Sequence, residues 1–179
     1  SPIQNMEPVS KLINHLNENS NLKILNCFAK GNTFGAFQNF DLVKGMNDFV
    51  DEFDSSRRNL IFTIGSNPVN NSVYSQKIKN HLISADYVVA LDLFKNETTE
   101  LADIILPTTS FTEKEGTFTN LEMRTLMQNK ILPAPGSSLN EWEYWAMLLG
   151  KVGLEQSYDS EIQLNSLLCE GYTLSLIHI

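Results

Sequence analysis

The sequence predicts an α/β fold: a doubly wound, mostly parallel sheet with helices on both faces. Short strands that are apolar on both sides recur at residues 59–64, 87–91 and 104–106. Segments with helical spacing of apolar residues separate these strands. A parallel sheet covered on both faces shows this alternation of buried strands and helices. We expect right-handed crossovers between the strands.

The N-terminal part of the chain contributes two predicted helices and one predicted strand. Apolar residues at helical spacing predict a helix around residues 9–16. Residues 22–29 have the composition of a short buried strand, and residues 30–45, with three glycines, are expected to form a long loop. A second amphipathic helix is predicted over residues 46–53. We expect the two arginines at 57–58 to close it, because cations are favoured near a helix C-terminus.

The later elements connect the strands and end the domain. The GSNP run at residues 65–68 predicts a sharp turn after the strand at 59–64. A helix over the sheet is predicted at residues 73–83, and Pro107 is expected to stop the third strand. Residues 141–152 predict a final helix with one apolar face. That face would carry Trp142, Trp145, Leu148 and Leu149.

We expect two parts in the chain, an α/β domain over residues 1–153 and a C-terminal extension over residues 154–179. The chain starts at Ser1 without a methionine, and it ends on the apolar run EGYTLSLIHI. These features predict a fragment of a larger protein, with a tail that is truncated or misread. Groups that complete a site are then expected on sequence outside this chain.

Composition and charge exclude several classes of protein. Apolar residues make up 42% of the 179 residues and charged residues 19%, which is ordinary for a globular domain. Asp and Glu number 21 against 13 Lys and Arg, so a nucleic-acid partner is not expected. No apolar stretch approaches the roughly 20 residues that span a bilayer. Direct membrane insertion is therefore not expected either.

Few residues suggest chemistry by their own pattern. Cys27 and Cys169 belong to no C-x-x-C pair, so an iron–sulfur or zinc cradle is not expected here. The GNTFG run at residues 31–35 matches neither the dinucleotide fingerprint nor the P-loop. The EKE run at 113–115 has the character of a solvated charged turn. We assign no catalytic residue and no metal ligand.

Ligands of a doubly wound sheet bind at the carboxyl ends of its strands. Four stretches are predicted there, at residues 30–35, 65–71, 92–98 and 107–120. The last is dense in hydroxyls, from Thr108, Thr109, Ser110, Thr112, Thr117 and Thr119. Hydroxyls and glycine amides hold a phosphate or a pterin without net positive charge. The alternative, which spacing alone favours, is that these groups only satisfy turn backbones.

The run FTIGSNPVN at residues 62–70, followed by ADYVVALDLFKNETTELADIILPTTSFTEKEGTFTNLEMR at residues 85–124, resembles the molybdopterin oxidoreductase family. The family pattern is G-x-N-P after a strand, then A-D-x-x-L-P and E-K-x-G-T-x-x-N-x-E-x-R. The matching residues are Gly65, Asn67, Pro68, Ala102, Asp103, Leu106, Pro107, Glu113, Lys114, Gly116, Thr117, Asn120, Glu122 and Arg124. The family usually has glycine between that Glu and Arg, where this chain has Met123.

The resemblance implies a Rossmann-like domain of the molybdopterin oxidoreductase type. If a pterin is bound, the implied cofactor is molybdopterin guanine dinucleotide, which the turns after these strands help to hold in family members that bind it. The implied cofactor-binding residues are Gly65, Asn67, Thr112, Gly116, Thr117 and Asn120. Asn120, Glu122 and Arg124 alternate as residues on one face of an extended segment do. Glu122 and Arg124 are therefore expected to pair.

The resemblance favours the large iron–sulfur subunit of NADH-quinone oxidoreductase (complex I), because residues 111–153 run from a Pro/Gly spacer into a Trp-rich helix. The domain would then be a scaffold beside the electron path, with no cofactor in this fragment and with iron–sulfur clusters on upstream sequence. Its partners would be other subunits of a respiratory or formate-oxidising complex, on the cytoplasmic side of the inner membrane. One alternative is the cofactor-binding part of a molybdopterin enzyme such as formate dehydrogenase. Another is a free-standing α/β binding module.

Overall fold

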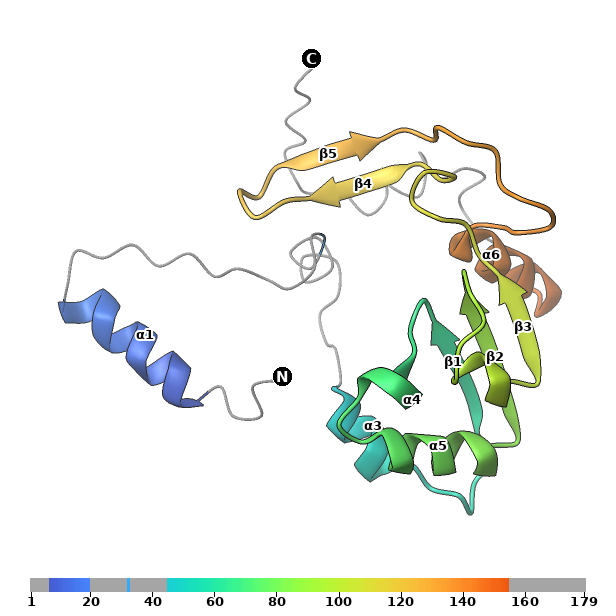
Figure 1. Cartoon of the computed structure of the whole chain (residues 1–179), viewed down its shortest axis with the longest axis horizontal. Helices are drawn as coiled ribbons and strands as arrows, with labels where there is room; N and C mark the ends of the chain where they lie inside the picture. The colour runs from blue at the N-terminus through green and yellow to red at the C-terminus, as the bar shows by residue number, and fades with distance from the viewer. Residues whose placement is uncertain (1–6, 20–31, 33–44, 155–179) are drawn as a thin grey trace.

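The computed structural model describes residues 7–19, 32 and 45–154 (Figure 1). The first helix, α1 (Glu7–Asn19), confirms the helix predicted at the N-terminus. The strand predicted at 22–29 lies outside the described residues, as does most of the loop predicted at 30–45. The extension also lies outside them from residue 155 on, so the division after residue 153 stays a prediction.

Three parallel strands form the main sheet, in the order β1–β2–β3. They are β1 (Leu60–Ile64), β2 (Tyr87–Asp92) and β3 (Ile104–Pro107), and they confirm the three predicted strands. Pro107 is the last paired residue of β3, opposite Asp92, rather than a stop before it. All three carboxyl ends lie on one side of the sheet, which we name the carboxyl edge (Figure 1).

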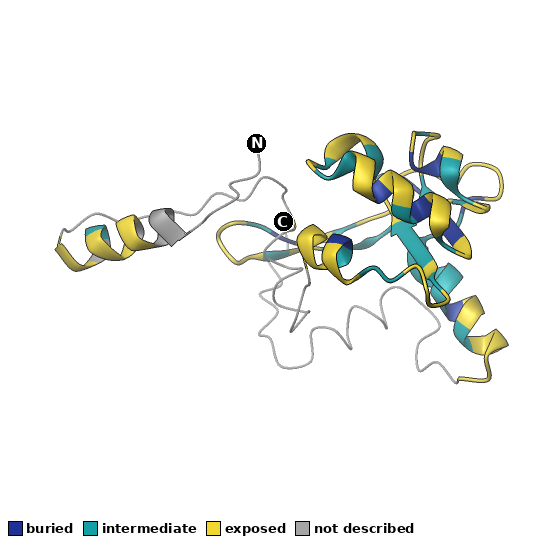
Figure 2. Cartoon of the chain, turned by 90° about the horizontal axis from the view of Figure 1, so that it is seen from below, coloured by how far each residue is buried: buried dark blue, intermediate teal, exposed yellow. Residues whose placement is uncertain are grey.

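Helices α3 (Met46–Glu52) and α5 (Ser75–Ser84) cover one face of the sheet. The main core lies there, in a buried cluster of Val50, Ile78, Leu82 and Val88. Figure 2 shows buried positions gathered where α5 meets the sheet. Alternate residues of a strand point to opposite faces of the sheet. A continuous apolar strand therefore places side chains both in this core and on the other face.

The predicted end of α3 needs one correction. The helix ends at Glu52, and the two arginines lie beyond it, where Arg57 pairs with Asp54 at 3.1 Å. The start of α3 is stabilised instead, because the Gly45 backbone N–H donates to Asp48 Oδ2 at 2.6 Å. A carboxylate in the first turn also interacts favourably with the helix dipole.

Helix α6 (Glu141–Lys151) covers the other face, where the Trp145 ring packs on Phe62 with ring centroids 4.9 Å apart. The helix begins at an Asn140 cap and ends in a Schellman motif around Gly153, whose φ is 77°. Of its predicted apolar face, Leu148 is 43% exposed, because it lies over an open groove on the sheet. The α/β fold with helices on both faces is confirmed.

A β-hairpin that the sequence does not predict follows the sheet. Strand β4 (Gly116–Thr119) lies inside the stretch 107–120 expected after the third strand, and it pairs antiparallel with β5 (Thr125–Gln128), which follows that stretch. Glu122 and Arg124 do pair, at 3.5 Å, but they sit in the hairpin turn and not on an extended segment. Strands of this length, rich in threonine, show no clear apolar alternation, which is why the pattern missed them.

Two short helices complete the described fold. Helix α4 (Pro68–Asn71) begins in the GSNP turn, and the 3₁₀ helix η1 (Thr99–Leu101) lies between β2 and β3. Within the described ranges, no helix has the length and apolar character needed to cross a membrane.

Candidate functional site at the carboxyl edge

Gly65 ends β1 in a left-handed conformation that turns the chain at the carboxyl edge. Its φ is +52°, and a side-chain carbon added there would meet nothing within 4 Å. Its backbone N–H still donates to the Leu91 carbonyl at 2.8 Å. Any other residue would be strained by this backbone conformation. The chain is therefore bare where β1 ends, which lets a ligand approach the backbone closely.

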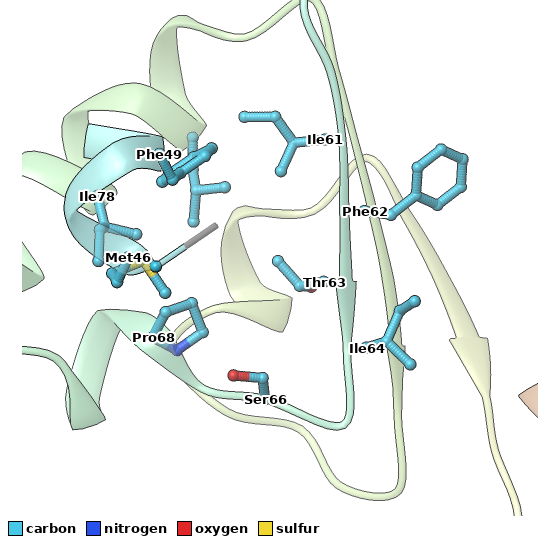
Figure 3. Close-up of a pocket in the computed structure, with 11 residues that line it drawn as sticks. Met46, Phe49, Ile61, Phe62, Thr63, Ile64, Ser66, Pro68 and Ile78 are labelled. Carbon is cyan, nitrogen blue, oxygen red and sulfur yellow. The ribbon is translucent and has the colours of Figure 1, made fainter. Parts of the chain in front are cut away.

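A cavity of about 230 Å³ opens beside this turn, between α3, α5 and β1 (Figure 3). Apolar side chains form most of its wall, among them Met46, Phe49, Ile61, Pro68 and Ile78. Thr63 and Ser66 add hydroxyls, and Figure 3 shows the Ser66 hydroxyl on the cavity side of the chain. The cavity can therefore take an apolar or planar group that carries few polar atoms.

Asn67 joins the turn after β1 to the turn after β2. Its Nδ2 donates to Glu97 Oε2 at 2.6 Å, and its Oδ1 accepts from the Thr98 hydroxyl at 2.8 Å. Thr98 Oγ1 in turn accepts from the Val69 backbone N–H at 3.3 Å. Thr98 is fully buried, whereas Glu97 is exposed. We name Asn67, Glu97 and Thr98 the edge triad.

Asn96 organises the turn from which Glu97 projects. Its Oδ1 accepts from the backbone N–H groups of Thr98 and Thr99, both at 3.0 Å. Its Nδ2 donates to Asp92 Oδ2 at 2.9 Å, at the end of β2. The Asn96 side-chain amide therefore stabilises the turn after β2, where the backbone hydrogen bonds of the strand end. Asparagine commonly has this role in loops.

The hydrogen bond from the Asn67 amide lowers the pKa of Glu97 below its ordinary value of 4.5. The backbone N–H of Glu97 acts in the same direction, and burial opposes both with a smaller effect. The carboxylate is therefore ionised at neutral pH and can only accept hydrogen bonds. A negative charge at this position disfavours a phosphate beside Glu97 and favours N–H donors.

Four of the six candidate residues lie elsewhere, on the segment from residue 107 to residue 140 that leaves the sheet and returns to it. We name this segment the excursion. Figure 1 shows its hairpin on the side of the sheet to which the strand arrows point. Among the described residues, no hydrogen bond joins this group to Gly65 or Asn67. The structure therefore divides the six candidates into two groups.

Thr112 and Asn120 hold the excursion together internally. The Thr112 hydroxyl lies 3.0 Å from the Ser110 hydroxyl, and the Thr112 carbonyl accepts two backbone N–H groups from residues 131–132 at 2.9 Å. Asn120 Oδ1 accepts from the backbone N–H groups of Glu122 and Arg124 at 2.9 and 3.0 Å, which closes the hairpin turn. Gly116 and Thr117 lie in β4, opposite Gln128 and Met127.

Two buried hydroxyls of the excursion, those of Thr109 and Thr119, also form hydrogen bonds within the protein. Thr109 donates to the Asn140 side-chain carbonyl, and the Thr119 and Thr125 hydroxyls lie 3.0 Å apart. Asn32, from the GNTFG run, accepts from the Thr119 backbone N–H at 2.9 Å. For these groups, the interpretation that threonine satisfies local structure fits better than ligand binding.

The base of the excursion is fastened to the start of α6. Lys114 Nζ lies 2.9 and 3.1 Å from the two Glu141 carboxylate oxygens. The Tyr144 hydroxyl donates to the Pro107 carbonyl at 2.9 Å, and burial raises the pKa of Tyr144, which keeps the phenol protonated. We name as the clasp the Lys114–Glu141 ion pair, the Tyr144–Pro107 hydrogen bond and the parallel bridge between Thr108 and Leu139.

Asn67, two residues after Gly65, thus contacts both Glu97 and Thr98 at the carboxyl edge. The sequence indicates only the stretch 92–98 as a strand end and does not single out Glu97 or Thr98. The signal that could have indicated these two residues is a carboxylate next to a hydroxyl, a few positions after a buried strand. In the part of the chain that the structure describes, no three His, Cys, Asp or Glu side chains lie close enough to hold a metal ion.

Comparison with known proteins gives the following relatives. A model of the molybdopterin oxidoreductase family matches residues 3–151. Over 108 residues the chain is 33% identical to the α subunit of an F420-dependent formate dehydrogenase from Methanocaldococcus jannaschii, a match that covers 59% of this chain and 16% of that protein. Over 93 residues it is 37% identical to the assimilatory nitrate reductase catalytic subunit of Bacillus subtilis, covering 52% of this chain and 13% of that protein.

Among solved structures, acetylene hydratase from Pelobacter acetylenicus is similar, with a TM-score of 0.50 and 26% identity. The similarity covers 54% of this chain and 14% of the hydratase. The chain thus spans only a small part of the length of each relative that it matches.

Proposed function

Since this chain belongs to the molybdopterin oxidoreductase family, we propose that it forms part of the cofactor-binding half of a molybdopterin-dependent oxidoreductase of the formate dehydrogenase kind. The relatives named as a formate dehydrogenase α subunit and a nitrate reductase catalytic subunit support this alternative over the complex I subunit that the sequence favours. The activity and the substrate of the whole protein are part of the proposal.

One observation carries the proposal: the bare, open turn at Gly65 lies beside the edge triad at the carboxyl ends of β1 and β2. Open α/β sheets bind their ligands at this edge. The groups present fit the organic part of molybdopterin guanine dinucleotide, because Gly65 leaves room, Ser66 offers a hydroxyl and Glu97 accepts N–H donors. When bound, that cofactor supplies the redox centre, and these residues would bind and orient its heterocycle.

The excursion has a different role in this proposal. The buried Thr109 and Thr119 hydroxyls and the Asn120 side-chain oxygen are already hydrogen-bonded within the protein. The excursion would therefore shape and cover the site beyond the carboxyl edge, and Gly116 and Thr117 stay candidates for a contact with the cofactor through the family resemblance.

The scaffold role, as in the large iron–sulfur subunit of complex I, has two observations in its favour. The excursion uses its polar groups internally, as a domain that has lost its pterin would, and Met123 occupies a turn position where the family usually has glycine. The named relatives give more support to a catalytic subunit. In either case we propose partner subunits, iron–sulfur clusters on other parts of the protein, and a cytoplasmic location beside the inner membrane through those partners.

The proposal is tested on the full-length protein, purified from a strain supplied with molybdate and tungstate. Metal content is measured by mass spectrometry, and guanine nucleotide is measured after acid release of the cofactor. We expect metal and nucleotide in fixed proportion to protein. A protein that carries neither would refute the proposal and support the scaffold role.

A further inference from the structure

The edge triad is a directed chain of hydrogen bonds. The Val69 backbone N–H donates to Thr98 Oγ1, so the Thr98 hydroxyl proton is available to Asn67 Oδ1, at 2.8 Å. Asn67 must then turn its Nδ2 toward Glu97, where it lies 2.6 Å from Oε2. The opposite orientation of the amide would face the Asn67 carbonyl oxygen against a carboxylate, which is repulsive. The buried threonine therefore determines which way the exposed end of the chain points.

The residues of the edge triad differ in burial, and only the exposed one can contact a ligand. Thr98 is fully buried and Asn67 is half-buried, whereas Glu97 is exposed at the carboxyl edge. A carboxylate has about four lone-pair positions, and the Asn67 amide occupies one of them, on Oε2. Glu97 therefore retains acceptor capacity toward solvent, in an orientation that the protein sets in advance.

We propose that Glu97 accepts the adjacent N–H and amino groups of a 2-amino-4-oxopyrimidine ring, and that Asn67 and Thr98 are positioning residues that aim its carboxylate. Guanine and pterin share this ring edge, with two neighbouring donors that match the two oxygens of a carboxylate. Adenine does not present this pair, and hypoxanthine lacks the amino group. The inference rests on the proposed function, because it assigns a residue to the heterocycle of the same cofactor.

The local charge agrees with this class of ligand. In the same turn, Asp92 and Asn96 are engaged with each other and Lys95 is an exposed cation, so Glu97 is the outward-facing acceptor. The bare backbone at Gly65, in the turn that also carries Asn67, leaves room for a flat ring beside that acceptor. A carboxylate repels the phosphates of a dinucleotide, so the phosphates must lie away from Glu97 while the ring faces it.

The test measures binding of GDP, inosine diphosphate, ADP and 6-hydroxymethylpterin to the full chain by titration calorimetry. We expect GDP to bind roughly tenfold to a hundredfold more tightly than inosine diphosphate, the usual range for losing a hydrogen bond to a charged group. Tight binding of the free pterin, with no preference among the purines, would assign the pterin as the ring that Glu97 accepts. Tight GDP binding would assign the guanine.

Four variants locate the effect. Glu97→Gln keeps the size of the side chain, and it should abolish the preference for the amino-bearing ring. Thr98→Val removes the hydroxyl and should reduce that preference, while Thr98→Ser restores it. Glu100→Gln, an exposed glutamate of the neighbouring 3₁₀ helix, should behave as the unaltered chain. Thermal unfolding of each variant checks that the fold is kept, and Glu97→Gln is on the surface, so its result stands if Thr98→Val fails to fold.

The outcomes separate the inference from the proposed function. An unaltered preference in folded Glu97→Gln overturns the inference, as does equal binding of all purine diphosphates without tight binding of the pterin. Equal binding would still be nucleotide binding and would leave the proposed function standing. Binding of none of the four probes also overturns the inference, and the metal and nucleotide content of the full-length protein then decides the proposed function separately.

Discussion

The sheet and the excursion are stabilised in different ways. In the sheet, Ile78 and Val88 are 1% exposed, within a continuous apolar cluster. In the excursion, Phe111 and Ile131 are 70% and 75% exposed, and most of the buried residues are threonines. Apolar burial is the larger and less specific contribution to stability, whereas hydrogen bonds contribute little each but determine geometry. The sheet should therefore unfold only globally, while the excursion opens locally at lower cost.

The largest expected effect tests the core under α5. Replacing Ile78 with alanine should lower the free energy of unfolding by about 3 kcal/mol, because it removes buried methyl groups and leaves a cavity. Chemical denaturation monitored by circular dichroism measures it. Ile83, on the same helix but 63% exposed, provides the matched control, and its alanine variant should change little. Equal effects at the two positions would mean that this core does not carry the stability of the sheet.

The next effect strengthens the excursion. Met123 holds a φ of 62°, which is unfavourable for a side chain with a Cβ, so Met123→Gly should stabilise the hairpin by about 1 kcal/mol. Hydrogen exchange of the β4 and β5 amides should slow, while exchange in β1 to β3 stays the same. Met127→Gly, in the middle of β5, is the control and should speed exchange in the hairpin. If Met123→Gly also speeds exchange, the turn is not strained.

A smaller effect is expected from loosening the clasp. Lys114→Met removes an ion pair whose side chains are about one-third exposed, so its loss should cost about 0.5 kcal/mol. Hydrogen exchange should rise in the excursion and not in the sheet. Lys130→Met, at an exposed position of the same segment, is the matched control. A uniform rise across both regions would show that the clasp supports the whole domain rather than the excursion alone.

The smallest expected effect is on how the free energy of unfolding depends on pH. The pKa of Glu97 is lowered in the folded chain, so its contribution to stability is present above pH 4.5 and is lost as the pH falls through the lowered pKa. The unfolding free energies of the unaltered chain and of Glu97→Gln should therefore differ near neutral pH and converge in acid. A difference that grows on acidification would contradict the assigned direction of the pKa shift.

The sequence predicts the sheet better than it predicts the site. Each strand of the sheet is a short run of apolar residues, a pattern that does not depend on distant parts of the chain. Gly65 and Asn67 follow from the G-x-N-P turn and its place after a strand. The hydrogen bond between Asn67 and Glu97 spans 30 positions and depends on the register of β1 against β2, which no local pattern contains.

The structure of the excursion could not be predicted from local sequence patterns, for a different reason. Its strands have four residues each, and threonine is common both in turns and in strands. Its base is held by a contact between Lys114 and Glu141, residues that look like separate surface charges in the sequence. Only the folded chain shows that the hydroxyls are used internally and that the turn at Met123 is left-handed.

The clasp places the points where the chain leaves the sheet and returns to it side by side, at Thr108 and Leu139. The entropy of closing a loop grows only slowly with its length, so segments of different lengths can join such points at similar cost. Evolution can therefore lengthen, shorten or exchange the residues between them without disturbing the register of the three strands. The same junction is a natural place to graft a reporter or a second domain onto this fold.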